Sequence, residues 1–262
     1  MKKSMRKRIL SLALAAVIAT CFIPVFALEG ALVEGNNFTM EPGTYTAKTD
    51  PLGLNGTGAA NAWRITDDGG KDGSAGYEIK AFMKDADTFR DDFSLRFSKI
   101  SVPTAAKVNT QVIEFDVKPM LSNLDAAIWV KPAGTNNVPL MFGFTKTGKI
   151  AGCWGRAPAN DADALYINGN PVTYTSGEWV HLKLEWNIVS KVGKFYVNDV
   201  HAVVNHTGEH NPEVGTGRAN YDYMDQVWVN CYPKNSGLTA ADAEKTLMVL
   251  DNVKTYGTYA VE

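Results

Sequence analysis

The segment "GEWVHLKLEWNIVSKVGKFYVND", residues 177–199, decides the fold class of this 262-residue chain. Between Trp179 and Trp186 apolar and polar residues alternate, which is the pattern of a strand that buries one face. The alternating run Lys194–Val200 follows a Gly-Lys pair, and this order predicts a hairpin that turns at Gly193. The segment therefore predicts two antiparallel strands with one face against a core.

Strand patterns cover most of the remaining chain. Clusters of Gly, Asn, Asp and Pro, such as "KPAGTNN", "INGNP" and "TKTGK", separate the strands. Only two short pieces favour helix: "TAADAEK", with Thr239 as its N-cap, and "AFMKDAD" at Ala81. This density of strands, with no linker or repeat, predicts an all-β sandwich. The other predicted strands are Val112–Val117, Ala127–Lys131, Leu140–Phe144, Leu165–Ile167, Gln226–Tyr232 and Leu247–Tyr256.

Several strands combine an apolar face with a face of aromatic, charged and amide side chains. Aromatic rings stack on the apolar faces of sugars, while carboxylates and amides hydrogen-bond sugar hydroxyls. If these strands are neighbours in one sheet, their polar faces form a groove for carbohydrate. The side chains expected there are Val112, Glu114, Asp116 and Lys118, then Trp129 and Lys131, then Trp179, His181, Lys183 and Glu185, and finally Trp228, Asn230 and Tyr232.

The aromatic residues have a structural alternative. A half-solvated antiparallel sheet has a polar outer face without any ligand, so a packing role for Trp129, Trp228 and Tyr232 stays open. Trp154, in the loop-like stretch "AGCWGRAP", is a second candidate sugar platform because loops offer few core positions. The tryptophans expected in the core are Trp63, Trp179 and Trp186.

Three segments resemble the concanavalin A-like, laminin-G-like jelly-roll superfamily of secreted bacterial proteins. They are "NNFTMEPGTYTAKTD" with the later "NAWRITDDGGKDGSAGYEIK", the opening hairpin segment, and the last strand "LMVLDNVKTYG". The resemblance covers most of residues 28–262 and implies a jelly-roll β-sandwich of two antiparallel sheets. It says little about function, because this fold includes lectins, binding modules, hydrolases and lyases.

The first 27 residues have the features of a signal peptide. Five basic residues precede the mostly apolar run Ile9–Ile23, and Val25 and Ala27 supply small residues at the −3 and −1 positions. The apolar run is short for a membrane span, and Cys21 leaves a lipoprotein open as an alternative. We therefore expect a secreted, extracellular protein in which residues 28–262 form one jelly-roll domain without a membrane span.

Charge and cysteine content exclude some partners and scaffolds. Removing residues 1–27 lowers the number of Lys and Arg residues from 26 to 21 against 28 acidic residues, which gives a net charge of −7. Nucleic acid and anionic membranes need a basic surface, so they are not expected as partners. Only Cys153 and Cys231 remain, and both a disulfide and two free buried thiols stay open.

The stretch "TQVIEFDVKP", residues 110–119, resembles half of a glycosidase signature. Glycoside hydrolases of family 16 carry Glu-x-Asp-x-x-Glu on one strand, and Glu114 and Asp116 match its first two carboxylates. Retaining hydrolysis needs a second Glu on the same face, but Val117, Lys118 and Pro119 follow. The motif is incomplete at its most necessary residue, and this argues against a hydrolase.

A lyase-like set is the other catalytic candidate. In a polysaccharide lyase of this fold, His or Tyr abstracts a proton and Arg binds the substrate carboxylate. The residues that would form the set are His181, Tyr166, Tyr232 and Arg156. None of the local lyase signatures is present, and a solvated His on a polar sheet face is the alternative. The sequence contains no serine-hydrolase elbow, zinc spacing or phosphate loop.

A structural calcium ion is implied by the jelly-roll resemblance. Related proteins often bind Ca²⁺ beside the last strand, where Asp251 lies, with an acidic residue near the first strand and oxygens of a Gly-rich turn. Glu41 and the turn "TDDGGKDGSAG", with Asp72, match these roles. The alternative is that the acidic residues only shape the turn and that Asp251 caps nearby backbone.

These observations predict a secreted, non-catalytic protein that binds a polysaccharide or a cell-surface glycan. The expected ligand-binding residues are Trp129, Trp228, Tyr232, Glu114, Asp116, His181 and Trp154, and the expected metal ligands are Asp251, Glu41 and Asp72. A glycan-cleaving enzyme, a lyase before a hydrolase, is the alternative. It gains support from the lack of a separate catalytic domain, because binding modules usually accompany one.

Overall fold

The computed structural model describes residues 31–37, 63–66, 68–89, 95–98, 108–132, 140–155, 161–205, 210–214, 223–224 and 226–259. The predicted signal peptide, with Cys21, lies outside the described residues. Among the described residues, the helices are single 3₁₀ turns, and none is long and apolar enough to cross a bilayer.

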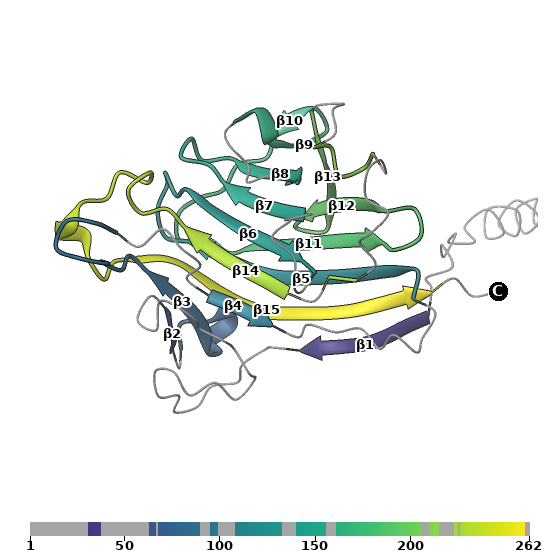
Figure 1. The fold of residues 1–262 in the computed structure, drawn as a ribbon, viewed down its shortest axis with the longest axis horizontal. Helices are drawn as coiled ribbons and strands as arrows, with labels where there is room; N and C mark the ends of the chain where they lie inside the picture. The colour runs from purple at the N-terminus through teal and green to yellow at the C-terminus, as the bar shows by residue number, and fades with distance from the viewer. Residues whose placement is uncertain are drawn as a thin grey trace, which may run out of the picture.

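The described strands form two antiparallel sheets (Figure 1). The larger sheet has the order β10 (Asn170–Pro171), β9 (Leu165–Ile167), β13 (Val200–Val204), β12 (Val192–Val197), β11 (Val180–Asn187), β5 (Thr110–Pro119), β15 (Thr246–Tyr259), β3 (Gly76–Lys80) and β2 (Trp63–Thr66), and β1 (Ala31–Asn37) also pairs with β15. The smaller sheet has the order β4 (Leu95–Ser98), β14 (Gln226–Cys231), β6 (Ala126–Lys131), β7 (Leu140–Phe144) and β8 (Ile150–Trp154). The predicted all-β sandwich of two antiparallel sheets is confirmed.

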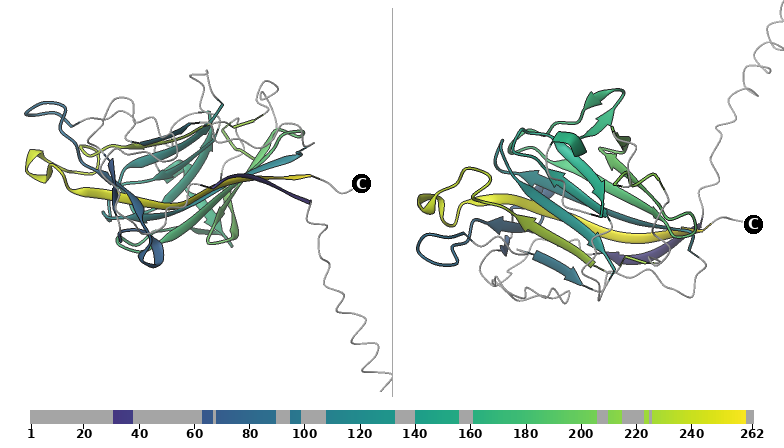
Figure 2. Two further views of the ribbon diagram at one scale, coloured as in Figure 1. Left: turned by 90° about the horizontal axis from the view of Figure 1, so that it is seen from below. Right: turned by 45° about the horizontal axis from the view of Figure 1, so that its top comes forward.

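Strand β15 organises the larger sheet. Its 14 residues pair with β5 along one edge and with β3 and then β1 along the other. The ladder with β5 is interrupted between Asp251 and Lys254, where Asn252 has a φ of +51°. Figures 1 and 2 show this strand as the long yellow ribbon that crosses the molecule.

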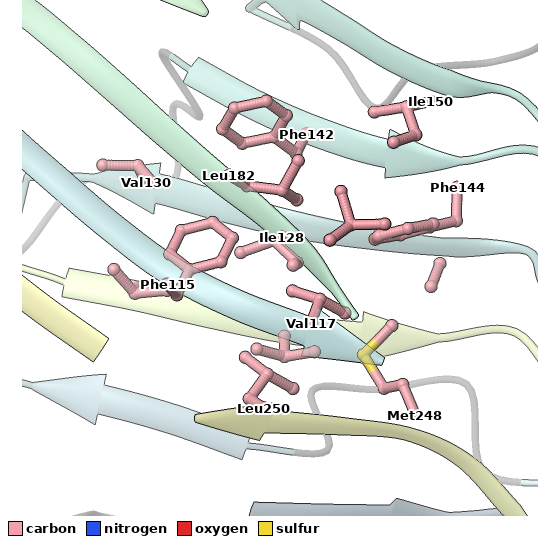
Figure 3. Close-up of a cluster of buried hydrophobic side chains, with 14 of the residues drawn as sticks. Phe115, Val117, Ile128, Val130, Phe142, Phe144, Ile150, Leu182, Met248 and Leu250 are labelled. Carbon is pink, nitrogen blue, oxygen red and sulfur yellow. The ribbon is translucent and has the colours of Figure 1, made fainter. Parts of the chain in front are cut away.

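The core lies between the two sheets. Ile113, Phe115 and Val117 on β5 point toward it, as the alternation predicted, and each is at most 1% exposed. Phe142 of β7 contacts Phe115 and Phe195 of the larger sheet edge to face, with ring centroids 5.8 and 4.6 Å apart. Figure 3 shows side chains from both sheets meeting in this cluster. Such close packing fixes which face of each strand remains available to solvent.

The hairpin of the opening segment is confirmed, but its predicted turn at Gly193 is wrong. Strand β11 ends at Asn187, whose side-chain oxygen accepts hydrogen bonds from the backbone of Val189 and Ser190, and Lys191 has a φ of +58°. Gly193 lies inside β12, opposite Trp186. A β-carbon there would lie 2.7 Å from Leu140, so this glycine allows the two sheets to approach each other.

The two short helix-prone pieces have different outcomes. Residues Ala240–Asp242 form a 3₁₀ turn, and the Asp242 carboxylate accepts hydrogen bonds from the backbone and hydroxyl of Thr239. The stretch from Ala81 is not helical, because Met83 makes an isolated β-bridge with Phe89. The predicted N-cap therefore orders a single turn rather than a helix.

Cys153 and Cys231 are both free and fully buried, so the disulfide alternative is excluded. Cys231 packs in the core between the sheets. Cys153 packs with Met141 and Trp129 in a separate cluster. Burial also raises the pKa of the Cys231 thiol, which keeps it protonated and inert.

Candidate functional site

The outward-facing side of the larger sheet carries a patch of polar and aromatic side chains, here called the open face. It is built from alternate residues of five neighbouring strands, and the register places them in adjacent rows. The open face consists of Glu114 and Asp116 on β5, His181, Lys183 and Glu185 on β11, Tyr196 on β12, His201 on β13, and Lys254 and Tyr256 on β15. Apart from Asp116, each of these residues is at least partly accessible to solvent.

Two tyrosine–glutamate pairs dominate the open face. The Tyr196 hydroxyl donates a hydrogen bond of 2.7 Å to Glu185 Oε2, and the Tyr256 hydroxyl donates one of 3.1 Å to Glu114 Oε2. Each pair joins neighbouring strands, so the carboxylates and the rings hold each other in position. The result is two oriented carboxylates, each beside a half-exposed aromatic ring.

Lys183 lies between these pairs. Its Nζ atom is 4.2 Å from the centre of the Tyr196 ring and 3.5 Å from Glu185 Oε1. The first contact is a cation–π interaction and the second is an ion pair. Lys183 therefore fixes the ring and the carboxylate of the same pair.

Asp116 is the centre of a buried network at one end of the open face. Its side chain is 4% exposed, and its Oδ1 atom lies 3.1 Å from both Lys71 Nζ and His181 Nδ1. The Asn252 side chain donates to Oδ2 at 2.7 Å. Burial by itself would raise the pKa of Asp116, but hydrogen bonds from His181, Asn252 and Lys71 outweigh it and lower the pKa to about 2.

Asp251, the register partner of Asp116 on β15, attaches the neighbouring turn to the sheet. Its Oδ2 atom accepts hydrogen bonds from the Lys71 backbone and the Ser74 hydroxyl, at 2.8 and 2.6 Å. Its Oδ1 atom accepts one from the Asn252 backbone at 2.7 Å. The turn around η1 (Lys71–Gly73) is thus held by two aspartates at one end of the open face.

The expected calcium ligands are placed only in part. The structure brings Asp251 and the Gly-rich turn together, but the contacts it gives Asp251 are with hydrogen-bond donors, as in the capping alternative. Asp72 is exposed, with a φ of +58°, and Glu41 lies outside the described residues. Within the described part of the chain, no three acidic, His or Cys side chains gather into a metal-binding group. The calcium ion stays a prediction.

The tryptophan candidates lie on the other sheet. Trp129 and Trp228 are direct neighbours on β6 and β14, and Tyr232 follows β14. On this outer face Met141 and Cys153 are fully buried, and Lys131 Nζ lies 4.0 Å from the centre of the Trp228 ring. The single groove expected from the sequence is therefore divided: these aromatics do not share a face with Glu114, Asp116 and His181.

Two further tryptophans depart from expectation. Trp154 ends strand β8, is 9% exposed, and stacks on Trp186 with ring centroids 5.5 Å apart and an interplanar angle of 16°. It is a core residue, so its prediction as a sugar platform is wrong. Trp179 precedes β11 and is only partly buried, with Lys118 Nζ 5.6 Å from its ring, so its prediction as a core residue is wrong as well.

The geometry does not assemble the lyase-like set. His181 lies on the larger sheet and Tyr232 beside the smaller one, while Arg156 lies outside the described residues. The hydrogen bond to Asp116 raises the pKa of His181, which favours the charged ring. Burial, and then the neighbouring glutamates, raise the pKa values of Tyr196 and Tyr256. A general base needs a pKa near the working pH, so these groups suit binding better than proton abstraction.

The sequence did not single out four residues that shape the site. Tyr196 and Tyr256 follow the alternation of their strands, so this signal could have included them. Lys71 and Asn252 come from a turn and from a β-bulge, where no periodicity indicates which side chain points to the sheet. These two residues could only be found from the structure.

The His181–Asp116 pair should make stability depend on pH. The raised pKa of His181 means that its contribution is complete below about pH 6.5, its unfolded value, and is lost as pH rises through the folded value. The lowered pKa of Asp116 means that its contribution is complete above about pH 4 and is lost toward about 2. The difference in melting temperature between wild type and His181→Gln should therefore be largest near pH 5–6 and smaller at pH 9. In an Asp116→Asn background, His181→Gln should change little, and an unchanged effect there would show that Asp116 is not its partner.

The chain matches no protein-family model and no curated protein sequence. Among solved structures it is similar to a mutant of alginate lyase Aly36B in complex with alginate tetrasaccharide, with 10% identity over 88% of this chain and 100% of that chain and a TM-score of 0.43. It is also similar to the cellulose-induced protein Cip1, with 13% identity over 80% of this chain and 88% of that chain and a TM-score of 0.45. Trypanosoma rangeli sialidase with sialic acid gives 12% identity, coverage of 71% and 26%, and a TM-score of 0.40, so this chain spans about a quarter of that protein.

Proposed function

We propose that this protein binds carbohydrate polymers on the open face of its larger sheet and does not cleave them. The observation that carries the proposal is the pair of Tyr–Glu units, Tyr196–Glu185 and Tyr256–Glu114, on neighbouring strands of an accessible sheet. A half-exposed ring beside an oriented carboxylate matches the two sides of a sugar, which are an apolar face and a rim of hydroxyls.

The proposal extends to the chain's class and location. It treats the protein as a member of the concanavalin A-like jelly-roll superfamily, exported after cleavage of residues 1–27. The motifs of the last strand and of the opening hairpin support the first part, and the basic and apolar start of the sequence supports the second. Export would bring the open face into contact with extracellular or cell-surface glycans.

Replacing the tyrosines should weaken binding. We expect Tyr196→Ala and Tyr256→Ala each to reduce affinity roughly tenfold, because a well-placed aromatic contact contributes about 1.5 kcal/mol. Affinity electrophoresis in gels containing soluble polysaccharides measures this loss, and a glycan array identifies the polymer to use. Trp129→Phe, on the other sheet, is the matched control and should bind as the wild type does. If Trp129→Phe loses binding while the tyrosine variants keep it, the site is on the smaller sheet.

The same samples distinguish binding from cleavage. Incubated with each polymer that binds, the protein should release no new reducing ends and no product with the ultraviolet absorbance of an unsaturated sugar. Either signal, if lost in Glu114→Gln or His181→Gln, would replace the binding proposal by a hydrolase or a lyase.

Calcium at Asp251 is part of the proposal and has its own test. If the ion is bound, EDTA should lower the melting temperature by several degrees, and Ca²⁺ should restore it better than Mg²⁺, which demands a stricter octahedron. The Asp251→Ala variant should then be insensitive to EDTA. A wild-type melt that ignores both EDTA and Ca²⁺ would leave the hydrogen bonds from Lys71, Ser74 and Asn252 as the whole role of Asp251.

A further inference from the structure

The centre of the open face offers hydrogen-bond acceptors. Glu114 and Glu185 lie on adjacent strands β5 and β11, and a tyrosine hydroxyl occupies only the Oε2 atom of each. Among the described residues, no hydrogen-bond donor is found on Glu114 Oε1. Because the Tyr256 hydroxyl holds the other oxygen, this acceptor has a defined direction before any ligand arrives.

The cations beside these carboxylates are largely occupied within the protein. Lys183 is engaged by Glu185 and by the Tyr196 ring. At the end of the face, Lys71 and His181 both contact Asp116. At the opposite side, His201 Nε2 lies 2.9 Å from Glu213 Oε1. A ligand that needed these cations would have to displace the protein's own carboxylates.

The electrostatic environment points the same way. The pKa values of Tyr256, Tyr196 and His181 are all raised; burial is the largest cause for the tyrosines and the hydrogen bond to Asp116 for the histidine. In addition, neighbouring carboxylate charges contribute to all three shifts, on three different strands. Negative potential therefore extends across the open face rather than around one residue.

We propose that the open face selects uncharged polysaccharides and rejects polyuronates; this inference rests on the proposed function. A neutral sugar presents hydroxyls that can donate to Glu114 Oε1, and its ring can lie on Tyr196 or Tyr256. A uronate presents a carboxylate that cannot donate a hydrogen bond. It also adds negative charge beside Glu114 and Glu185, which is unfavourable at these short distances.

Polymers with one backbone and two charge states give the sharpest test. Hydroxyethyl cellulose with carboxymethyl cellulose, and methyl-esterified with de-esterified polygalacturonate, are two such pairs, and the glycan array supplies others. At low salt the full-length chain should bind the neutral member of any recognised pair at least about tenfold more tightly than the acidic one. Raising the salt concentration should leave neutral binding unchanged and improve acidic binding, because screening weakens the repulsion.

Charge-neutralising variants test the residues. Glu114→Gln with Glu185→Gln keeps an acceptor for each tyrosine and should reduce the preference for neutral over acidic polymers severalfold, while Glu244→Gln, an exposed site elsewhere, should not. Equal or tighter binding of the acidic polymers by the wild type overturns this inference but leaves the proposed function intact. Binding to no polymer of either kind overturns both. The salt series uses only the wild type, so it tests the inference even if the double variant misfolds.

Discussion

Replacing Trp186 by alanine should lower the free energy of unfolding by about 3–5 kcal/mol, the range for a large aromatic removed from a core. Trp186 is fully buried in β11, and its ring stacks on Trp154 across the two sheets. The variant would lose this stack and leave a cavity that the two sheets cannot close without moving. Urea unfolding followed by circular dichroism measures the change, with the slope m as a check on two-state behaviour.

Two further variants separate packing from hydrophobicity alone. Trp186→Phe keeps a ring and should cost clearly less than Trp186→Ala. Trp154→Ala should also destabilise the protein, and the two losses should not add, because each variant removes the same stack. If Trp154→Ala leaves stability unchanged, then Trp154 is not the core residue that its burial and its contact with Trp186 indicate.

The Asp116→Ala variant should have the second largest effect, a loss of about 2–3 kcal/mol. Breaking a fully buried ion pair costs about 3–5 kcal/mol, but the Lys71 side chain is 34% exposed and water will compensate part of the loss. The variant leaves Lys71, His181 and Asn252 without their shared acceptor. Thermal and urea unfolding near pH 6 measure the loss, and Asp116→Asn should fall between wild type and Ala.

The exposed ion pair between Lys80 and Glu244 is the matched control. Its atoms are 3.0 Å apart, close to the distance at Asp116, but the Glu244 side chain is 58% exposed. Exposed pairs contribute about 0–1 kcal/mol, so Glu244→Ala should change stability little. Equal losses at Asp116 and Glu244 would mean that burial does not set the strength of these pairs.

Alternation along a strand predicted which way side chains point. On β5 and β11 it separated Phe115, Leu182 and Trp186, which are buried, from Glu114, His181 and Glu185, which are accessible. The reason is geometric, because successive residues of a strand face opposite sides. It also placed Trp228 correctly on the opposite side from Val227 and Val229.

Alternation could not predict which strands share a sheet. The face of Trp129 and Trp228 and the face of Glu114 look alike in sequence, and only pairing between residues more than 100 positions apart assigns them to different sheets. Strand β8 was missed for another reason. Its small residues Ala151 and Gly152 give no strand signal, but a β-carbon at Gly152 would lie 2.8 Å from Phe195, so the packing needs glycine there.

The position of β15 has a consequence for how fast the protein reaches its native state. This strand lies between β5 and β3 in the interior of the larger sheet, and it pairs Thr110 with Thr258 and Lys80 with Thr246. Loops of this length must close before the strand can join, and such non-local pairing makes folding slow. Until residues 246–259 arrive, one edge of β5 stays unpaired and can recruit another chain. We therefore expect the nascent protein to aggregate during refolding from denaturant at high concentration, and to depend on chaperones until its last strand is inserted.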